Sequence, residues 1–453
     1  MRLYLFRGVA MFFFYSLVYT LAFLAMLPVF AVSGIVRGKR AAGFFQRLSF
    51  FLPAFVPDDR NVVWLHCVSV GEANAARPLV DRLHTEFPNV RLIISTTTRT
   101  GQKLAKEIFK DADAVFYVPF DWRWTVRRVL RHFRPTLLVI METELWLNLI
   151  REACKSHTRI ALVNGRMSER SFKRYAAFKK TMKRLFGYID RGLIQTGADA
   201  NRFMALGMRA SKVKVTGNLK FDHSITETEV ALTDEFRARF VSVDGGPLII
   251  AASTHEPEER YVLAAFRKTW EKTREALPRL MIAPRHPERF DDVARLIEGS
   301  GFQYVRRSAA PDEKDAEAEV ILLDSIGELR AAFPLAEIVF VGGSLIEHGG
   351  QSILEPAAAG KAIITGPYTH NFKAIVEEFI EREALIQLPK EALNDAPASL
   401  AAEFCKLLDR PEKRKGLGER ARAAMNNNRG AIDRTFEQLR PLIERSPNRP
   451  SSR

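Results

Sequence analysis

Cysteine is scarce in this sequence, and the three that occur, Cys67, Cys154 and Cys405, are widely spaced and odd in number. This pattern excludes a disulfide framework and a CxxC metal site, and it indicates a reducing compartment. Short repeats, low-complexity tracts and clusters of histidine and cysteine at metal-binding spacing are also missing, and only the tail "RSPNRPSSR" has a disordered composition. These absences indicate a folded protein that rests on packed cores.

Acidic residues are fewer than basic ones, 53 against 68, which leaves a formal charge of +15. Such an excess indicates an anionic partner, which is nucleic acid, a phosphorylated substrate or a membrane surface. The chain has 453 residues, more than the roughly 250 to 300 that one core supports. We therefore expect two domains.

A long run without charge occurs once near the start, over 25 residues from Gly8 to Val32. A bilayer core requires roughly 20 apolar residues, so the run predicts an N-terminal membrane anchor. A signal peptide is the alternative, although its apolar region is usually only about 7 to 15 residues long. Arg2 and Arg7 precede the run, and the positive-inside bias places the rest of the chain in the cytoplasm. The basic residues that follow the run are Arg37, Lys39, Arg40 and Arg47.

Short β-rich segments alternate with helical patterns along the remainder. The predicted strands are "NVVWLHCV", "VRLIISTT", "AVFYVPF", "TLLVIME", "RIALVNG" and "RGLIQTG", and then "PLIIAAS", "LMIAPR", "EVILLD", "EIVFVGGS" and "KAIITG". The alternation predicts an α/β fold with parallel sheets, and the pause at "SVDGGPL" separates two Rossmann-like halves. In such folds ligands bind beyond the carboxyl ends of the strands, so we expect the site in a cleft between the halves.

Charged side chains follow several of these strands. Glu72 comes after "HCVSVG", where a glycine allows a sharp turn into a helix whose first turn favours a carboxylate. Glu142 and Glu144 lie in "METELW", and Lys220 lies in "VTGNLKFD" just before the second half. Each alone is as readily a helix-start acid or a solvated loop cation. Because parallel strands end at one edge of a sheet, their joint placement predicts a binding site.

A glycine-rich connection, "VFVGGSLIEHGGQSILEPAAAG", joins a strand to a helix in the second half. Glu347 and Glu355 lie in this stretch, and a glutamate one turn into the helix can accept both ribose hydroxyls of a nucleotide. Arg285 ends another strand, where a guanidinium can bind a phosphate. The pattern predicts a sugar-nucleotide donor site. The glycines expected to let backbone amides approach a phosphate are Gly342, Gly343, Gly349 and Gly350.

The order of segments resembles one family over nearly the whole chain, the 3-deoxy-D-manno-octulosonic acid (Kdo) transferases of Gram-negative bacteria. The segments that carry the resemblance are "HCVSVGE", "STTTRTG", "METELW", "NGRMSERS", "TGNLKFD", "STHEPEE", "APRHPERF", "FVGGSLIEHGGQSILEP" and "GPYTHNF". The resemblance implies a GT-B glycosyltransferase at the cytoplasmic side of the inner membrane. It implies inverting, metal-independent transfer of Kdo from CMP-Kdo to the lipid A precursor, lipid IVA, in lipopolysaccharide core biosynthesis. It also implies no cofactor and no nucleic-acid partner.

The roles of single residues follow from the same resemblance. Glu72 matches the family's proton acceptor, and Glu142 and Lys220 match positions that stabilise the transition state. The chemistry is consistent, because an acceptor hydroxyl needs a base and the phosphate of the leaving CMP needs cations or amides. The positions that match the family's CMP contacts are Pro284, Arg285, Gly327, Glu328, Leu329, Ser352, Ile353, Leu354 and Glu355.

The chain departs from the family pattern at three places. Gln351 and Ser352 stand where the family usually has His-Asn, Leu147 stands in place of proline, and Pro257 stands in place of glycine. The departure bears most on the expected CMP contact of Ser352. The lone "DAD", residues 111–113, is interpreted as loop acids, since a single phosphate has less need of a bridging cation.

A basic segment, 168–186, is predicted to form one amphipathic helix. Either its apolar stripe meets a membrane interface, or the stripe faces a core and leaves a solvated basic side. The anchor and a bisphosphorylated acceptor favour the interface. The stripe consists of Phe172, Tyr175, Phe178, Met182, Leu185 and Phe186. The cations expected to contact anionic lipid headgroups and acceptor phosphates are Lys173, Arg174, Lys179, Lys180 and Lys183.

The expected organisation is an anchor over 1–33, an acceptor domain over 34–241, a CMP-Kdo donor domain over 242–445 and a disordered tail over 446–453. The last helix is allowed to pack back on the acceptor domain. Two other classes of protein remain as alternatives. A sugar-nucleotide epimerase would share the architecture but need no membrane segment, and a nucleic-acid-binding protein would rest on the charge and on "VRRVLRHFR".

Overall fold

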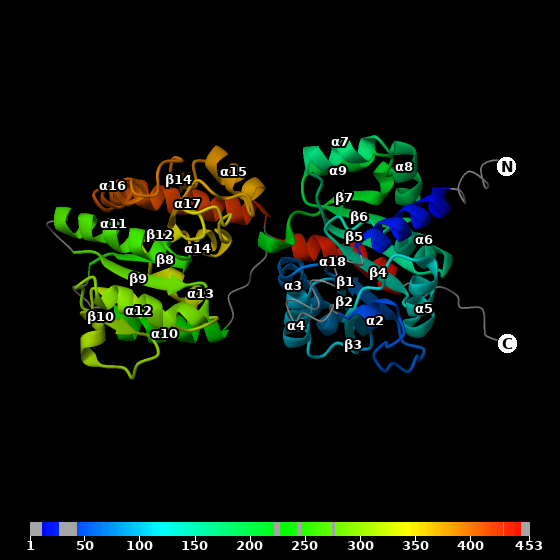
Figure 1. Cartoon of the computed structure of the whole chain (residues 1–453), viewed down its shortest axis with the longest axis horizontal. Coiled ribbons are helices and arrows are strands. Elements are labelled where there is room, and N and C mark those ends of the chain that lie inside the picture. Colours follow the sequence, from blue (N-terminus) through cyan, green and yellow to red (C-terminus); the bar gives the residue numbers. More distant parts are fainter. Residues whose placement is uncertain are drawn as a thin grey trace. The chain divides into compact units, whose positions relative to one another are not determined.

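The computed structural model describes residues 11–26, 43–221, 227–241, 246–273, 277–428 and 430–444. The chain forms two compact units (Figure 1). Unit 1 comprises Met1–Asp222 and Arg429–Arg453, and unit 2 comprises His223–Asn428. The fold is α/β with one parallel seven-stranded sheet in each unit, which confirms the predicted α/β class with parallel sheets.

The sheet of unit 1 has the strand order β3-β2-β1-β4-β5-β6-β7. The order reverses between β1 and β4, which pair in parallel with Trp64 opposite Leu138. Such a switch point is where open α/β sheets bind their ligands. The strands are β1 (Val62–His66), β2 (Arg91–Thr96), β3 (Ala114–Tyr117), β4 (Leu137–Met141), β5 (Arg159–Gly165), β6 (Arg191–Ile194) and β7 (Val213–Val215).

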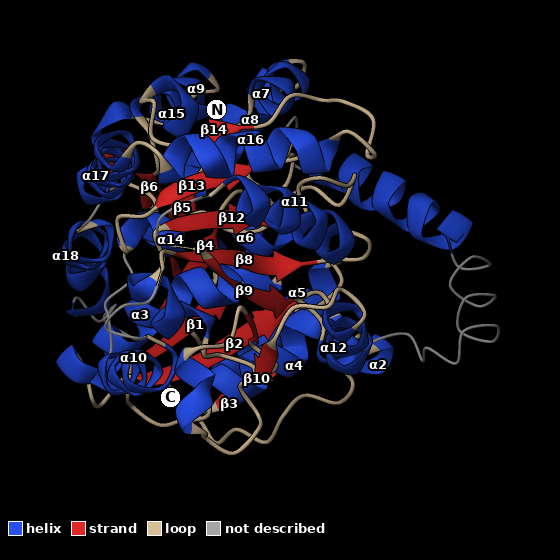
Figure 2. Ribbon diagram, turned by 90° about the vertical axis from the view of Figure 1, so that its left-hand side faces the viewer, coloured by secondary structure: helices blue, strands red, loops and turns tan. Residues whose placement is uncertain are grey.

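Helices pack on both faces of this sheet, where they form two core clusters; Figure 2 shows the helices of the chain in blue and its strands in red. Side chains alternate along each strand, so β1 sends Trp64 into one core cluster and Leu65 into the other. Burial on both faces accounts for the almost continuous apolar runs in the sequence. The helices and 3₁₀ turns of unit 1 are α2 (Phe44–Arg47), α3 (Val70–Glu86), α4 (Arg99–Ile108), α5 (Arg123–Phe133), α6 (Leu147–Lys155), α7 (Glu169–Ala176), α8 (Lys179–Tyr188), α9 (Gly197–Ala205), η1 (Ala210–Lys212), η2 (Leu219–Phe221) and α18 (Ala431–Glu444).

Unit 2 repeats the architecture with the strand order β10-β11-β9-β8-β12-β13-β14, and its switch point lies between β8 and β12. Its strands are β8 (Leu248–Thr254), β9 (Arg279–Pro284), β10 (Tyr304–Arg306), β11 (Val320–Leu322), β12 (Ile338–Val341), β13 (Ala362–Thr365) and β14 (Ile386–Gln387). Its helices and 3₁₀ turns are α10 (Glu227–Phe240), α11 (Glu258–Lys272), η3 (Pro287–Arg289), α12 (Phe290–Glu298), η4 (Glu313–Ala316), α13 (Leu329–Ala332), η5 (Phe333–Leu335), α14 (Leu354–Ala358), α15 (Lys373–Glu381), α16 (Ala396–Leu408) and α17 (Pro411–Asn428).

All eleven strands predicted from the sequence are present, and three further strands, β7, β10 and β14, have only two or three residues each. The boundary between the units lies at Asp222 rather than at 241. The reason is the packing of α10 on unit 2, where Thr233 donates a hydrogen bond to the carbonyl of Ala331 (2.9 Å) and Arg239 forms an ion pair with Asp315 (2.6 Å). The last helix, α18, lies in unit 1.

Residues 11–26 form a helix that packs on unit 1 (dark blue in Figure 1). The rest of the predicted anchor lies outside the described residues. Its inner side is tied down by specific contacts. Tyr15 donates to Asp121 (2.8 Å), Asn148 donates to Ser16 (3.1 Å), and Phe12 is only 1% exposed. This segment is therefore part of unit 1 rather than a separate anchor domain.

The outer side of the same helix is apolar and exposed. Phe13 and Phe14 are 68% and 66% exposed, values that are high for phenylalanine in a folded domain. Within the described part of the chain, no helix is both long and apolar enough to span a bilayer. Other exposed apolar side chains of the helix are Leu17, Val18, Leu21, Leu24 and Met26.

Candidate active site

Glu72 lies just beyond the carboxyl end of β1, in the first turn of α3. Its carboxylate accepts hydrogen bonds from the backbone N–H of Val68 (2.8 Å) and from the hydroxyl of Ser69 (3.1 Å). Ser69 is the N-cap residue of α3, so Glu72 does make the local contacts of a helix-start acid. The side chain is nevertheless buried, with only 6% exposed.

Burial gives Glu72 a second property. Loss of solvation raises the pKa of this carboxyl to about 7, and the nearby charges of Glu142 and Glu144 act in the same direction. The hydrogen bonds from Val68 and Ser69 oppose the shift without cancelling it. A carboxyl that titrates near neutral pH can take a proton from a hydroxyl during a reaction and release it afterwards.

Glu142 follows β4 at the other side of the switch point, with its backbone in the left-handed region at φ 54°. Its two oxygens bind two different cations, Lys220 Nζ at 2.8 Å and Arg166 Nε at 2.9 Å. Burial alone would raise the pKa of Glu142, but the two cations outweigh it and hold the pKa below its usual value. Glu142 is thus ionised at neutral pH, and Glu72 is the carboxyl able to exchange a proton.

Lys220 lies in η2, and side-chain amides set its position. Asn164 Oδ1 accepts from the N–H of Leu219 (3.0 Å), and Asn218 Oδ1 accepts from the N–H of Lys220 (3.1 Å). The lysine thereby reaches Glu142 from a position 78 residues further along the chain. The structure brings the three residues expected to take part in catalysis to the carboxyl edge of one sheet.

Arg166 is a member of this group that sequence reasoning did not assign. It stands directly after β5 in "NGRMSERS", a segment noted only for the resemblance. Because β5 pairs with β4, their carboxyl ends are adjacent, and Arg166 meets Glu142. A rule that examined every polar residue at a strand end would have found it.

The residues expected to bind CMP lie at the carboxyl edge of the sheet in unit 2. Pro284 ends β9 and is buried, whereas the next residue, Arg285, is exposed. Gly327 and Glu328 precede α13, and the 352–355 stretch enters α14. The predicted donor contacts therefore follow three parallel strands of one sheet. β11 and β9 are adjacent, and β12 is separated from β9 by β8.

Several of these side chains already have partners within unit 2. Arg307 donates to both oxygens of Glu328 (3.0 and 3.2 Å), and the hydroxyl of Ser352 donates to Glu355. Ile353 and Leu354 are buried in the core, at 0% and 2% exposed. These two residues can offer only backbone groups to a ligand, and Leu329 is half-buried.

The glycine-rich connection after β12 differs from the prediction. The carboxylate of Glu258 accepts hydrogen bonds from the backbone N–H groups of Gly343 (2.6 Å), Ser344 (2.9 Å) and Leu345 (2.9 Å). It also accepts from the N–H of His255 (3.0 Å). Of the four glycines expected to meet a phosphate, Gly343 is thus bound by a glutamate from α11, whereas the N–H groups of Gly342 and Gly350 donate to the carbonyls of Ala252 and Gly343.

The close packing of this loop accounts for its first glycine. A Cβ atom on Gly342 would lie 2.7 Å from the Cα of Thr254 and 3.0 Å from an oxygen of Glu258. His255 and His348 lie against each other beside the loop, with ring centroids 4.0 Å apart. Burial, followed by the neighbouring imidazoles, lowers the pKa of His255 to about 4, so this histidine is neutral at physiological pH.

The basic segment also differs from the prediction. It forms two helices, α7 and α8, that are separated at Ala177 and Phe178. Met182, Leu185 and Phe186 are buried in the core of unit 1, and of the predicted stripe only Phe178 is largely exposed, at 64%. The stripe therefore faces the core, because it closes the sheet beside β6. The exposed cations of the segment are Lys173, Arg174, Lys179, Lys180 and Lys183.

Asp113, the last residue of "DAD", has a structural role. It forms an ion pair with Arg91 (2.7 Å) and accepts from the N–H of Leu92 (2.9 Å). These contacts fix the start of β3 against β2. Among the described residues, no three histidine, cysteine or acidic side chains are arranged to hold a metal ion.

Two α/β units, each built on one parallel seven-stranded sheet, define a GT-B-like architecture. The fold resembles that of UDP-GlcNAc 2-epimerase from Neisseria meningitidis, with a TM-score of 0.56 and 14% identity over 84% of this chain and all of that one. At this identity the likeness shows the fold alone, so the fold does not favour the epimerase alternative.

Sequence comparison decides the family. The family model for 3-deoxy-D-manno-octulosonic-acid transferase matches residues 42–223. The chain is 34% identical to the 3-deoxy-D-manno-octulosonic acid transferase of Haemophilus influenzae over 88% of this chain and 91% of that protein. It is 32% identical to the transferase of Bordetella pertussis over 93% and 98% of the two chains. The chain belongs to the Kdo transferase family, and it is a glycosyltransferase.

Proposed function

We propose that this protein transfers Kdo from CMP-Kdo to a hydroxyl of the lipid A precursor, at the cytoplasmic side of the inner membrane. The observation that carries the proposal is the pair of unlike carboxyls at the switch point of unit 1. Glu72 has a pKa of about 7, and Glu142 is held ionised by Lys220 and Arg166. Family membership supports Kdo as the transferred sugar, and the lipid acceptor is part of the proposal.

The reaction needs a base, and Glu72 has the required properties. The acceptor oxygen forms a bond to the anomeric carbon of Kdo while its proton passes to the Glu72 carboxylate. The bond between that carbon and the phosphate oxygen breaks, and CMP leaves with the electron pair. Attack from the face opposite the leaving group inverts the anomeric carbon, and general base catalysis of this kind contributes about 10² to 10⁴-fold.

Lys220 and Glu142 act on charge in this scheme. As the bond to CMP breaks, positive charge develops on the sugar ring and negative charge on the phosphate. Glu142 stabilises the former, and Lys220 stabilises the latter. We propose that no metal ion takes part, since CMP presents a single phosphate.

The membrane contact is proposed to involve the helix over 11–26 and the basic face of α7 and α8. Exposed apolar side chains on a helix that is fixed to a domain suit an interfacial position, with the helix lying along the bilayer surface. Phe45, Phe50, Phe51 and Trp124 of unit 1 are exposed as well, and Arg128 lies 5.6 Å from the ring of Phe50. Anionic headgroups would contact Arg128 and the cations of α7 and α8.

The direct test is product formation. Pure protein is incubated with CMP-Kdo and tetra-acylated lipid A precursor in detergent, and the products are weighed by mass spectrometry, which also counts the sugars added. An identical reaction with EDTA examines the need for a metal. Absence of any Kdo-bearing product from folded protein would overturn the proposed function.

Glu72→Gln is the matched test of the base. The amide keeps the size and hydrogen bonding of the side chain but accepts no proton, so turnover should fall at least 10²-fold while CMP binding is retained. Asp81→Asn is the control, because this exposed residue of the same helix undergoes the same chemical change. Activity of Glu72→Gln within tenfold of the parent would contradict the role of Glu72.

A further inference from the structure

Asp121 is a buried carboxylate to which the proposed chemistry gives no role. It lies in the turn between β3 and α5 and is only 1% exposed. Among the described residues, the donors that its carboxylate oxygens accept from are neutral, a hydroxyl and two backbone N–H groups. Loss of solvation raises the pKa of Asp121 to about 7, and these hydrogen bonds oppose the shift without cancelling it. Because a buried carboxylate without a cation is costly, its contacts should show what it is kept for.

The carboxylate of Asp121 caps the start of α6. The N-cap residue of this helix, Trp146, makes no side-chain hydrogen bond to the helix. Asp121 supplies the missing acceptors from another turn, because Oδ2 accepts from the N–H of Asn148 (3.0 Å) and Oδ1 from that of Leu149 (2.8 Å). The side-chain amide of Asn148 also donates to the backbone carbonyl of Asp121 (2.6 Å). The position of α6 therefore depends on Asp121.

The same carboxylate is joined to the helix over 11–26. The hydroxyl of Tyr15 donates to Oδ2 of Asp121 (2.8 Å), and the backbone N–H of Asp121 donates to the hydroxyl of Tyr19 (3.3 Å). Asn148 donates to Ser16 of this helix as well (3.1 Å). Asp121 thus links three segments that are far apart in the sequence, which are the N-terminal helix, its own turn and the start of α6.

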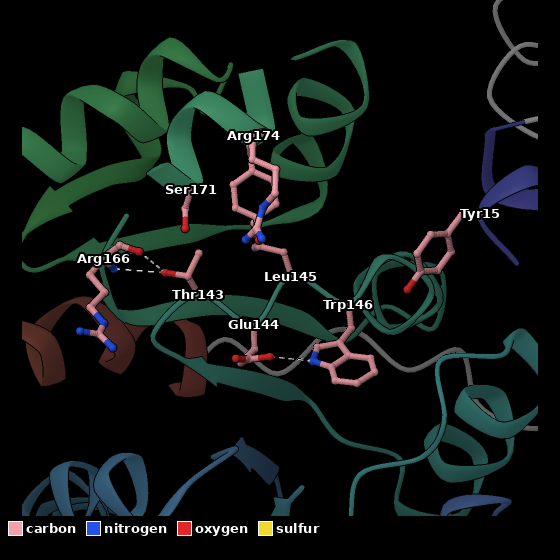
Figure 3. Close-up of a pocket in the computed structure, with 9 residues that line it drawn as sticks. Tyr15, Thr143, Glu144, Leu145, Trp146, Arg166, Ser171 and Arg174 are labelled. Atoms are coloured by element: carbon pink, nitrogen blue, oxygen red, sulfur yellow. Dashed lines mark hydrogen bonds between the residues drawn. The ribbon is translucent and has the colours of Figure 1, made fainter. Parts of the chain in front are cut away.

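A short loop connects these linked segments to Glu142. The loop between β4 and α6 comprises residues 142–146, so Glu142 begins it and α6 follows its end. Tyr15 lines one cavity of about 340 Å³ together with Thr143, Glu144 and Trp146 of this loop (Figure 3). A displacement of the N-terminal helix or of α6 would therefore reach Glu142 through only a few residues.

The backbone of Glu142 needs support from both ends of the loop. Its φ of 54° lies in the left-handed region, which a residue with a Cβ atom keeps only where the surroundings impose it. The N–H of Glu142 donates to the carbonyl of Val163 (2.8 Å), which fixes the first end. Asp121 fixes the other end through α6. If that end were released, Glu142 could relax and lose its geometry with Lys220.

We propose that Asp121 is a positioning residue for Kdo transfer, which joins the helix over 11–26 to the start of α6 and so holds the loop that carries Glu142. The inference rests on the proposed function, and it gives the N-terminal helix a part in catalysis beyond contact with a membrane. Asparagine could not replace Asp121. Each carboxylate oxygen accepts from one N–H of α6, so in either orientation the NH₂ group of an asparagine would face a backbone donor.

The test compares Tyr15→Phe with Thr20→Val. Tyr15→Phe removes the hydrogen bond from the helix to Asp121 and leaves the cap of α6 in place. Thr20 lies on the same helix, and its hydroxyl accepts from the indole N–H of Trp122 (2.9 Å), a contact with the turn between β3 and α5 that does not involve α6. Both variants therefore remove a hydrogen bond that holds the helix in place. Full-length proteins are assayed in detergent with dispersed acceptor, after circular dichroism and thermal unfolding have established the folded fraction.

The expected effect is on turnover rather than on substrate binding. Tyr15→Phe should lower kcat about tenfold, since misplacement of a catalytic group by about 1 Å can cost about 10²-fold. The KM values for the acceptor and for CMP-Kdo should stay within about threefold of the parental values. The midpoint of the kcat/KM pH profile should move to lower pH, because the charges of Glu142 and Glu144 raise the pKa of Glu72 and a relaxed loop carries them away. Thr20→Val should keep the parental kcat and midpoint.

A purely structural role of the contact predicts a different pattern. Tyr15→Phe would then lower the unfolding temperature but keep the parental kcat and midpoint, and this result would overturn the proposal. Equal losses of kcat in Tyr15→Phe and Thr20→Val would overturn it too, because any loosening of the helix would then suffice. Asp121→Asn should lower kcat at least as much as Tyr15→Phe. The double variant should lose less than the product of the two single losses, since both act on one contact, and a full product would contradict the link.

Hydrogen exchange without substrates separates this proposal from the proposed function. In Tyr15→Phe, but not in Thr20→Val, the amides of peptides that cover 142–149 should exchange faster than in the parent. That result would support the link even if the parent transferred no Kdo, which would be a failure of the proposed function alone. If the parent transfers Kdo and Tyr15→Phe keeps the parental kcat and exchange, the link fails and the proposed function stands.

Discussion

Replacement of Glu258 by glutamine is expected to loosen the loop after β12. In the parent, one carboxylate oxygen accepts from the N–H groups of Ser344 and Leu345, and the other accepts from those of Gly343 and His255. A glutamine has one acceptor oxygen and one NH₂ group. In either orientation the NH₂ group faces two backbone donors, so two of the four hydrogen bonds are lost.

The magnitude follows from the type of hydrogen bond. A hydrogen bond to a charged group contributes about 1.5 to 3 kcal/mol, so the loss of two costs about 3 to 6 kcal/mol, a large share of the roughly 5 to 15 kcal/mol that stabilises a domain. Glu258 is fully buried, and water cannot replace the missing acceptor without entering the core. CMP binding should weaken too, because this loop leads into the predicted donor residues before α14.

Hydrogen exchange measures the loss of these hydrogen bonds at the backbone amides of the loop. In Glu258→Gln the backbone amides of peptides that cover 341–346 should exchange faster, and urea should unfold the protein at a lower concentration. Glu256→Gln is the control, since Glu256 is exposed and two positions away, and its effect should stay within about 0.5 kcal/mol. Unchanged protection of these amides in Glu258→Gln, with parental stability, would refute the reasoning.

Three further expectations concern unit 1. The kcat/KM for Kdo transfer should rise with pH and level off above about 7, because only ionised Glu72 accepts a proton. Glu144→Gln removes a charge that raises the pKa of Glu72, so it should move the midpoint of this pH profile to lower pH. Phe12→Ala should lower the unfolding free energy by about 3 to 5 kcal/mol, whereas Phe13→Ala, at a 68% exposed position, should leave stability unchanged and weaken binding to anionic vesicles in flotation assays. Lys220→Gln should reduce kcat more than the acceptor KM in steady-state assays, and equal loss in both would assign Lys220 to binding.

The sequence predicted the parts of this structure that depend on local pattern. All eleven predicted strands formed, and residues after those strands, such as Glu72 and Glu142, lie at the sheet edge where parallel topology must place them. For Glu142 and Lys220 the sequence predicted only that both lie at the same binding site, and it did not predict their ion pair. Its geometry depends on Asn164, which lies 55 residues before the backbone N–H that it binds.

The errors came from long-range packing. The contacts of Glu258 with a loop 85 to 87 residues away leave no local signal, so the glycines appeared free to bind phosphate. The sequence pattern of the apolar stripe on α8 was compatible with contact to a membrane or to a core. In the structure Leu185 and Phe186 are buried in the core. The boundary at 241 followed composition, whereas α10 packs by hydrogen bonds that join distant segments.

The place of α18 in unit 1 has a consequence for synthesis of the chain. Phe436 and Ile443 complete the apolar cluster on one face of the first sheet, together with Val63 and Leu65 from β1. Translation produces β1 early and α18 last, with all of unit 2 in between. At about 5 to 20 residues per second, the ribosome needs roughly 10 to 40 s to make the intervening segment.

During that interval one face of the nascent first sheet is covered only in part, by α3 and α4, whereas unit 2 contains all of its own core residues. The later half of the protein can therefore fold to completion before the earlier half. A stop codon just before Ala431 would leave unit 2 intact and remove part of the cover of unit 1, so loss of the last 23 residues should send the first domain, not the second, to chaperones and proteases.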